Sequence, residues 1–300
     1  MNHWGLFTNS LGKMLHPLLW VYGLLVVLGS SNLGVLFLFN DQTLRNLSRA
    51  ATPQAVLASL TPLIGIFVVV SVIGFVFATF GLAALIHLIN KLELRERVTL
   101  GMGLDGGEKI FQLLIVRVIL ILPNLLMVVL AVALMSGQLS RVDLTSRANP
   151  LSGLAGGFCG FTLIAVVVSL LTSAISVGAE RAIVIEKLSI GKALGLGWQL
   201  VFTQLGDFII IGLIFLGLSI LIGILFACVG QPLLGLMLGT ASRAALTRGG
   251  LLTNPVMLLS IGVSLIGNLL ATILGTSVWT LAYQQWRADR LPAPLMDEFA

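Results

Sequence analysis

Long apolar runs alternate with short polar segments along the whole chain. A helix needs about 20 apolar residues to cross the hydrocarbon core of a bilayer, and six runs reach that length. They are Leu18–Phe39, Leu57–Asn90, Ile110–Ser136, Gly157–Gly178, Phe208–Val229 and Val256–Tyr283. The pattern predicts an all-α fold: a polytopic transmembrane helical bundle of about six spans. We expect a single transmembrane domain over residues 1–290 and an extended tail over residues 291–300.

The second run is longer than one span requires. It predicts either a strongly tilted helix or a span preceded by an interfacial turn at Pro62.

Two of the polar segments are copies of each other. Residues 98–112 read VTLGMGLDGGEKIFQ and residues 188–202 read LSIGKALGLGWQLVF. Aligned without a gap, Thr99 matches Ser189, Gly101 matches Gly191, Leu104 matches Leu194 and Gly107 matches Gly197. Each copy, called an elbow below, joins two apolar runs, so the chain contains two helix–elbow–helix repeats.

Apolar residues recur in both elbows near helical spacing, which is typical of an amphipathic helix lying in the headgroup layer. Thr99 and Ser189 precede these helices and are candidate N-caps. Lys and Arg are more frequent in the segments on the N-terminal side of the bundle, and every lysine lies there. By the positive-inside rule, both termini and both elbows are expected in the cytoplasm. The repeats are then parallel rather than inverted.

Interfacial tryptophans are expected near the ends of the first and last runs. Trp4, Trp20 and Trp286 occupy those positions.

The composition supports a membrane protein and argues against several other classes. The chain is 57% hydrophobic and 10% charged, with a mean hydropathy of +1.06, whereas soluble domains carry about 25% charged residues. The net charge of +5 is dispersed, so nucleic acid is not an expected partner. Cys159 and Cys228 lie inside apolar runs, where cysteine is usually a small buried hydrophobe. We therefore expect no metal and no cofactor.

Arg117 lies inside the third apolar run, and an ionisable residue at membrane depth is a functional candidate. Alternatively, its side chain extends back to the membrane surface, or it pairs with Glu108, Glu180 or Asp207. Asp207 occupies the position equivalent to Arg117 in the second repeat, which suggests an ion pair between the repeats. Asp207 also suits the first turn of a helix.

Other polar residues in the runs are few. Pro123 is expected to kink the third helix, and Asn124 to hydrogen-bond the freed carbonyl or a neighbouring helix. His87 is a candidate ligand for haem or chlorophyll. The alternative is a polar residue near a helix end, since a bis-histidine haem would need a second histidine at similar depth.

Small residues recur at four-residue spacing, as in Gly267, Ala271 and Gly275, which indicates tight helix contacts. The chain contains no H-E-x-x-H, G-x-S-x-G or Walker motif. We therefore do not expect an enzyme.

The segment RAIVIEKLSIGKALGLGWQLVFTQLGDFIIIGLIF resembles bacterial six-helix membrane proteins akin to the membrane domain of some glycerophosphodiester phosphodiesterases. In those proteins an elbow with a Gly-Trp pair, here Gly197-Trp198, leads into a transmembrane helix. The segments HPLLWVYGLLVVLGS and SVWTLAYQQW fit the same arrangement. The resemblance implies an integral membrane domain of the bacterial inner membrane and transfers no catalytic residue, because the phosphodiesterase chemistry belongs to a separate soluble domain.

These observations favour a non-catalytic accessory or scaffold subunit of a larger membrane complex, such as a respiratory or photosynthetic one, in contact with lipid or quinone. Its expected partners are membrane lipids and other integral membrane subunits. The alternative is a transporter or permease for a lipid-like or apolar solute. Arg117, Asn124, Glu180 and Asp207 would then lie on its pathway.

Overall fold

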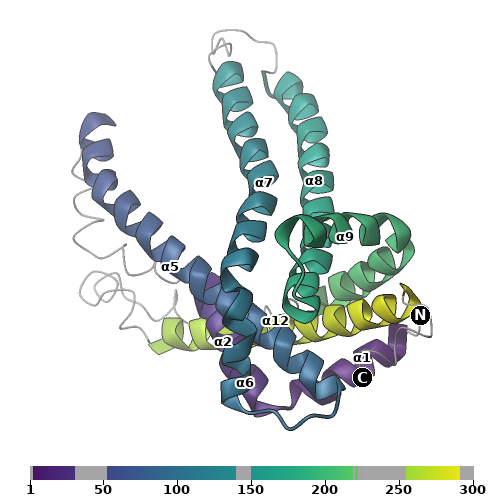
Figure 1. Ribbon diagram of the computed structural model, residues 1–300. Coiled ribbons are helices and arrows are strands. Elements are labelled where there is room, and N and C mark those ends of the chain that lie inside the picture. The colour runs from purple at the N-terminus through teal and green to yellow at the C-terminus, as the bar shows by residue number, and fades with distance from the viewer. Residues whose placement is uncertain are drawn as a thin grey trace. The chain divides into compact units, whose positions relative to one another are not determined.

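The computed structural model describes residues 3–30, 53–139, 150–218, 220, 221, 224 and 255–290. Every regular element in this part of the chain is a helix (Figure 1). The elements are α1 (His3–Met14), α2 (Pro17–Ser30), α5 (Pro53–Glu93), α6 (Leu100–Asp105), the 3₁₀ turn η1 (Gly106–Lys109), α7 (Ile110–Leu139), α8 (Pro150–Glu186), α9 (Ile190–Thr203) and α12 (Pro255–Arg290). A further helix covers Leu205–Leu218. The all-α prediction is confirmed, and the predicted tail at 291–300 lies outside the described residues.

Four helices are long and apolar enough to cross a membrane. They cover Ile64–Glu93, Leu100–Leu134, Gly160–Glu186 and Ile261–Asp289. Two further candidates are bent pairs, α1 with α2 at 95° and α9 with Leu205–Leu218 at 85°. The described chain therefore has four to six helices that fit a multi-pass membrane protein.

Helix α5 continues without a break through Pro62. The structure therefore contains no interfacial turn at that residue. With 41 residues, α5 is about 60 Å long, about twice the thickness of a bilayer core.

The chain divides into two compact units. One contains Met1–Ile110 and Ile209–Ala300, and the other contains Phe111–Phe208.

In the first unit, α2 and α5 pack with their backbones in contact. A Cβ on Gly74 would lie 2.6 Å from the carbonyl oxygen of Gly29, and one on Gly81 would lie 2.9 Å from that of Tyr22. Such distances leave no room for a side chain. The α2–α5 pair therefore requires glycine at these positions.

Helix α12 contacts α1, α2 and α5 and supplies much of the core of this unit. Tyr283 and Trp286 are fully buried, with Trp286 only 1% exposed. Its ring packs in the core, 6.4 Å from that of Trp279. The depth of Trp286 at the membrane interface stays a prediction.

The two elbows begin as predicted but differ in form. Thr99 (φ −122°, ψ 160°) and Ser189 (φ −70°, ψ 157°) have the extended backbone of N-caps, and the helices start at the next residue. Neither hydroxyl makes a capping hydrogen bond. The first elbow is α6 followed by η1 and continues into α7, whereas the second is the 14-residue α9, after which the chain bends by 85°.

A left-handed residue precedes each elbow. Arg95 has φ 58° and Lys187 has φ 54°. After α5, the Arg95 N–H donates to Leu92 O and the Glu96 N–H donates to Lys91 O, at 3.2 and 3.1 Å, which is the Schellman arrangement. A non-glycine residue in this conformation costs about 1 kcal/mol, so both turns hold a basic residue where glycine would be more stable.

Helix α1 is a third elbow-like helix that sequence analysis missed. It buries Leu6 and Phe7 and exposes Trp4 and Leu11. The segment SLGKML at residues 10–15 matches SIGKAL at residues 189–194. In α1, however, this motif ends the helix, whereas in α9 it begins it.

In the second unit, α9 packs across α8 through glycine (Figure 1). A Cβ on Gly197 would lie 2.6 Å from Ile175 O and 3.1 Å from Ala179 N. One on Gly178 would lie 2.9 Å from the Cα of Gly197. Ala193, Leu200 and Val201 complete the buried face of α9.

We predict opposite effects for two glycine substitutions in α9. Gly197→Ala should destabilise the protein by about 2 kcal/mol, because the new methyl group meets the backbone of α8. A Cβ on Gly195 would meet nothing within 4 Å. Gly195→Ala should therefore stabilise α9 by up to about 1 kcal/mol. Unfolding in detergent, followed by circular dichroism, measures both changes, and equal effects would contradict the close α8–α9 contact.

Candidate functional site

A buried ion pair joins α7 to α8. The Nε of Arg117 lies 2.7 Å from Oε1 of Glu180, and the two side chains are 22% and 7% exposed. Both residues lie on long, predominantly apolar helices. Glu180 is one of the three partners that sequence analysis named for Arg117.

A second polar contact lies two turns further along the same pair of helices. Asn124 Nδ2 donates to Thr172 Oγ1 at 3.1 Å, and Thr172 Oγ1 donates to Val168 O at 2.9 Å. Asn124 Nδ2 also lies 3.4 Å from Leu120 O. Helix α7 continues through Pro123, and Asn124 bonds the neighbouring helix, which is one of its two expected roles.

Polar residues form a stripe along one side of α8. Ser169, Ser173, Ser176 and Glu180 follow one another at the three- and four-residue spacings of a helix face. Ser169 and Ser173 are exposed, whereas Glu180 is buried. The stripe thus runs from exposed hydroxyl groups to the Arg117–Glu180 ion pair, and we call it the α8 polar stripe.

The other two predicted site residues lie elsewhere. Asp207 is the third residue of the helix Leu205–Leu218, a first-turn position that suits a carboxylate, and it interacts with other groups. The ion pair between Arg117 and Asp207 stays a prediction. His87 lies on α5 in the first unit, where its Cβ is 3.0 Å from the position of a Cβ on Gly106. It therefore packs against η1.

The described residues include no group of three or more His, Cys, Asp or Glu side chains that could hold a metal ion.

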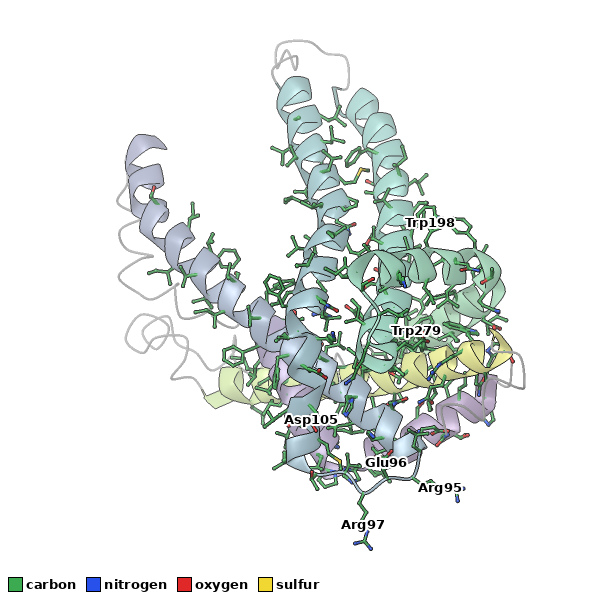
Figure 2. All side chains as sticks on the ribbon, in the orientation of Figure 1. Arg95, Glu96, Arg97, Asp105, Trp198 and Trp279 are labelled. Atoms are coloured by element: carbon green, nitrogen blue, oxygen red, sulfur yellow. The ribbon has the colours of Figure 1, made fainter. Side chains whose placement is uncertain are left out.

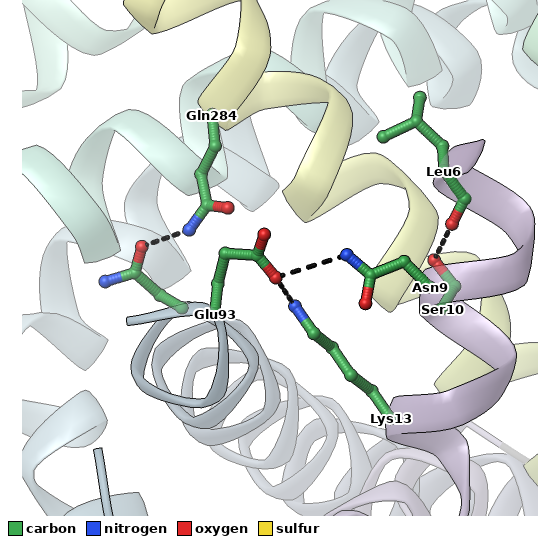
Figure 3. A network of polar contacts seen from close by, with 7 residues as sticks. Leu6, Asn9, Ser10, Lys13, Glu93 and Gln284 are labelled. Atoms are coloured by element: carbon green, nitrogen blue, oxygen red, sulfur yellow. Dashed lines mark hydrogen bonds and ion pairs between the residues drawn. The ribbon is translucent and has the colours of Figure 1, made fainter. Parts of the chain in front are cut away.

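A polar network ties together three helix ends in the first unit (Figure 3). The carboxylate of Glu93 at the end of α5 accepts hydrogen bonds from Lys13 and Asn9 of α1. Gln284 Nε2 of α12 donates to Asn90 Oδ1 of α5 at 2.6 Å. Burial lowers the pKa of Lys13 from 10.5 to about 8, so the Glu93 carboxylate stabilises a cation that its surroundings disfavour.

Neither this network nor the α8 polar stripe was predicted from the sequence, for different reasons. Lys13 and Glu93 are separated by 80 residues, and no local pattern connects them. The serines of α8, in contrast, lie at helical spacing inside the predicted run Gly157–Gly178, and only Glu180 lies beyond its end.

Searches against protein-family models, curated proteins and solved structures find no match to this chain. The resemblance to the membrane domains of glycerophosphodiester phosphodiesterases therefore stays a prediction.

We predict that Arg117 and Glu180 are energetically coupled. Arg117→Met should destabilise the protein by about 3 kcal/mol, because it leaves a buried carboxylate without its cation. Adding Glu180→Leu should recover most of that loss, since two apolar side chains pack in place of the pair. Denaturant unfolding of both single variants and the double variant gives the coupling energy. Additive effects would show that the ion pair contributes nothing specific.

Proposed function

We propose that this chain is a non-catalytic integral membrane protein that serves as an accessory or scaffold subunit of a larger membrane complex. An energy-transducing complex of the bacterial cytoplasmic membrane is the example we favour. We place both termini on its cytoplasmic side, from the distribution of lysine and arginine.

The α8 polar stripe is the observation that carries the proposal. Hydroxyl groups on a membrane-spanning helix gain nothing from facing lipid, whereas small residues and serines are enriched where helices pack together. Ser169 and Ser173 are exposed in this structure. A helix from a partner subunit would cover them and bring its backbone close to α8.

The low burial of α7 and α8 supports the same function. In the most apolar part of the Leu100–Leu134 span, 11% of the residues are buried, and in that of the Gly160–Glu186 span, 6% are buried. The corresponding values for Ile64–Glu93 and Ile261–Asp289 are 28% and 39%. Within their own unit, α7 and α8 thus leave much of their surface uncovered.

A transporter for a lipid-like solute is the second candidate, because the α8 polar stripe ends at a buried charge pair. Ionisable residues within membrane helices often mark substrate or ion pathways. In that case Arg117→Lys should alter uptake while other membrane proteins neither co-purify with the chain nor depend on it.

Affinity purification in mild detergent tests the subunit proposal. We expect other integral membrane proteins to co-purify at fixed stoichiometry. The double variant Ser169→Leu/Ser173→Leu should reduce their recovery by at least about threefold, since an interhelical polar contact in membranes contributes about 0.6 kcal/mol and leucine also blocks close approach.

Ile164→Leu/Val167→Leu is the matched control, because these exposed residues lie on the opposite side of α8 from the stripe. It should leave recovery unchanged. A wild-type chain that purifies alone, or equal losses in both double variants, would contradict the proposal.

A further inference from the structure

The segment KLELRER, residues 91–97 at the end of α5 and in the turn after it, contains five charged residues. Both of its acids are neutralised within the protein. Glu93 pairs with Lys13 of α1, and Glu96 pairs with Lys91 at 2.8 Å. Only the two arginines of the turn, Arg95 and Arg97, are left to carry its outward charge.

Arg95 and Arg97 are exposed, and their side chains point away from the ribbon (Figure 2). Neither forms an ion pair with any residue in the described part of the chain. The turn therefore presents two positive charges to its surroundings, two residues apart.

Exposed leucines flank these arginines. Leu94 is 61% exposed, and Leu100 and Leu104 at the start of the first elbow are 53% and 60% exposed. The candidate span Ile64–Glu93 ends directly before them. A surface that combines apolar and basic side chains at the end of a spanning helix is typical of the boundary between lipid headgroups and acyl chains.

The backbone at Arg95 indicates that the charge, not the conformation, determines which residue stands there. Its φ of 58° favours glycine. Before the second elbow, the left-handed position is again held by a basic residue, the exposed Lys187 at φ 54°. A basic side chain at both left-handed positions is therefore a shared feature of the two elbows.

We infer that Arg95 and Arg97 bind the phosphate groups of anionic lipids at the membrane surface where α5 ends. Guanidinium groups bind phosphate oxygens in a bidentate manner, and the flanking leucines contact the upper acyl chains. The inference rests on the proposed membrane location of the chain but does not depend on the proposed partner subunits.

Native mass spectrometry of the full-length protein tests it, in detergent that contains equal amounts of phosphatidylglycerol and phosphatidylcholine. The wild type should retain phosphatidylglycerol in preference. Arg95→Gln/Arg97→Gln should lower that preference by at least about fivefold, since one basic residue near an anionic surface contributes about that factor. Arg95→Lys/Arg97→Lys should keep an intermediate preference, because the charge remains but the bidentate contact is lost.

The variant Arg95→Gly distinguishes loss of lipid binding caused by the missing charge from loss caused by unfolding. It should raise the thermal midpoint, because glycine adopts the left-handed conformation without strain, and at the same time lower the lipid preference. A variant that is more stable and yet binds less anionic lipid cannot be explained by loss of structure.

Two results would overturn the assignment. One is an unchanged lipid preference in folded Arg95→Gln/Arg97→Gln, including the case in which that variant loses a co-purifying acidic protein instead. The other is displacement of phosphatidylglycerol by inorganic phosphate at matched ionic strength, which would identify a free-phosphate site. A clear lipid preference in a chain that purifies alone would support this inference while contradicting the subunit proposal.

Discussion

Backbone contact at glycine is the constraint on which the described structure depends. Glycine lets α2 approach α5 at Gly29 and Gly74, and lets α9 approach α8 at Gly178 and Gly197. In lipid there is little hydrophobic force between helices, so close van der Waals contact and interhelical hydrogen bonds must supply the stabilisation. Adding one methyl group at Gly197 or Gly74 would remove the contact that sets the helix pair.

The elbows use the same glycine packing to place basic side chains at the ends of apolar helices. Each elbow folds back on the end of the long helix before it: Gly107 lies against Phe80 of α5, and Gly197 lies against Ile175 of α8. The turn that makes this possible holds Arg95 in one copy and Lys187 in the other. The same local geometry thus reverses the chain and places a basic side chain at the end of an apolar helix.

Polar groups in the long helices divide into those that are satisfied internally and those that face outward. Arg117 and Glu180 satisfy each other, and Asn124 bonds Thr172. Ser169 and Ser173 remain exposed on the same helix. The α8 polar stripe therefore begins at the Arg117–Glu180 ion pair and ends at exposed hydroxyl groups. Those hydroxyl groups are the proposed contact with a partner helix.

The helices and the elbow starts were predictable because they depend on local sequence. Apolar run length predicted the four long apolar helices, and Thr99 and Ser189 marked where α6 and α9 begin. Contacts between distant segments were not predictable. Small residues at four-residue spacing, such as Gly267, Ala271 and Gly275, indicate a contact face but do not specify which helix packs against it. Trp286 has the sequence context of an interfacial residue, but α12 turns it into the core.

The candidate site was predictable in part. An arginine inside an apolar run pointed to Arg117, and charge alone limited its partners to three acids. Choosing Glu180 among them requires the rotation of α7 and α8 about their axes, which a sequence does not specify.

From the amphipathic sequence of α9 we propose that this helix lies along the membrane surface and that its glycine contact with α8 holds it there. Spin labels attached at Lys192, Gln199 and Thr203, all exposed, measure depth through their relative accessibility to oxygen and to a polar relaxation agent. The account predicts one common depth at the headgroup level for all three. Residues 192 and 203 would differ in depth by about 16 Å if α9 ran across the bilayer, and a steady increase of that size would contradict the account.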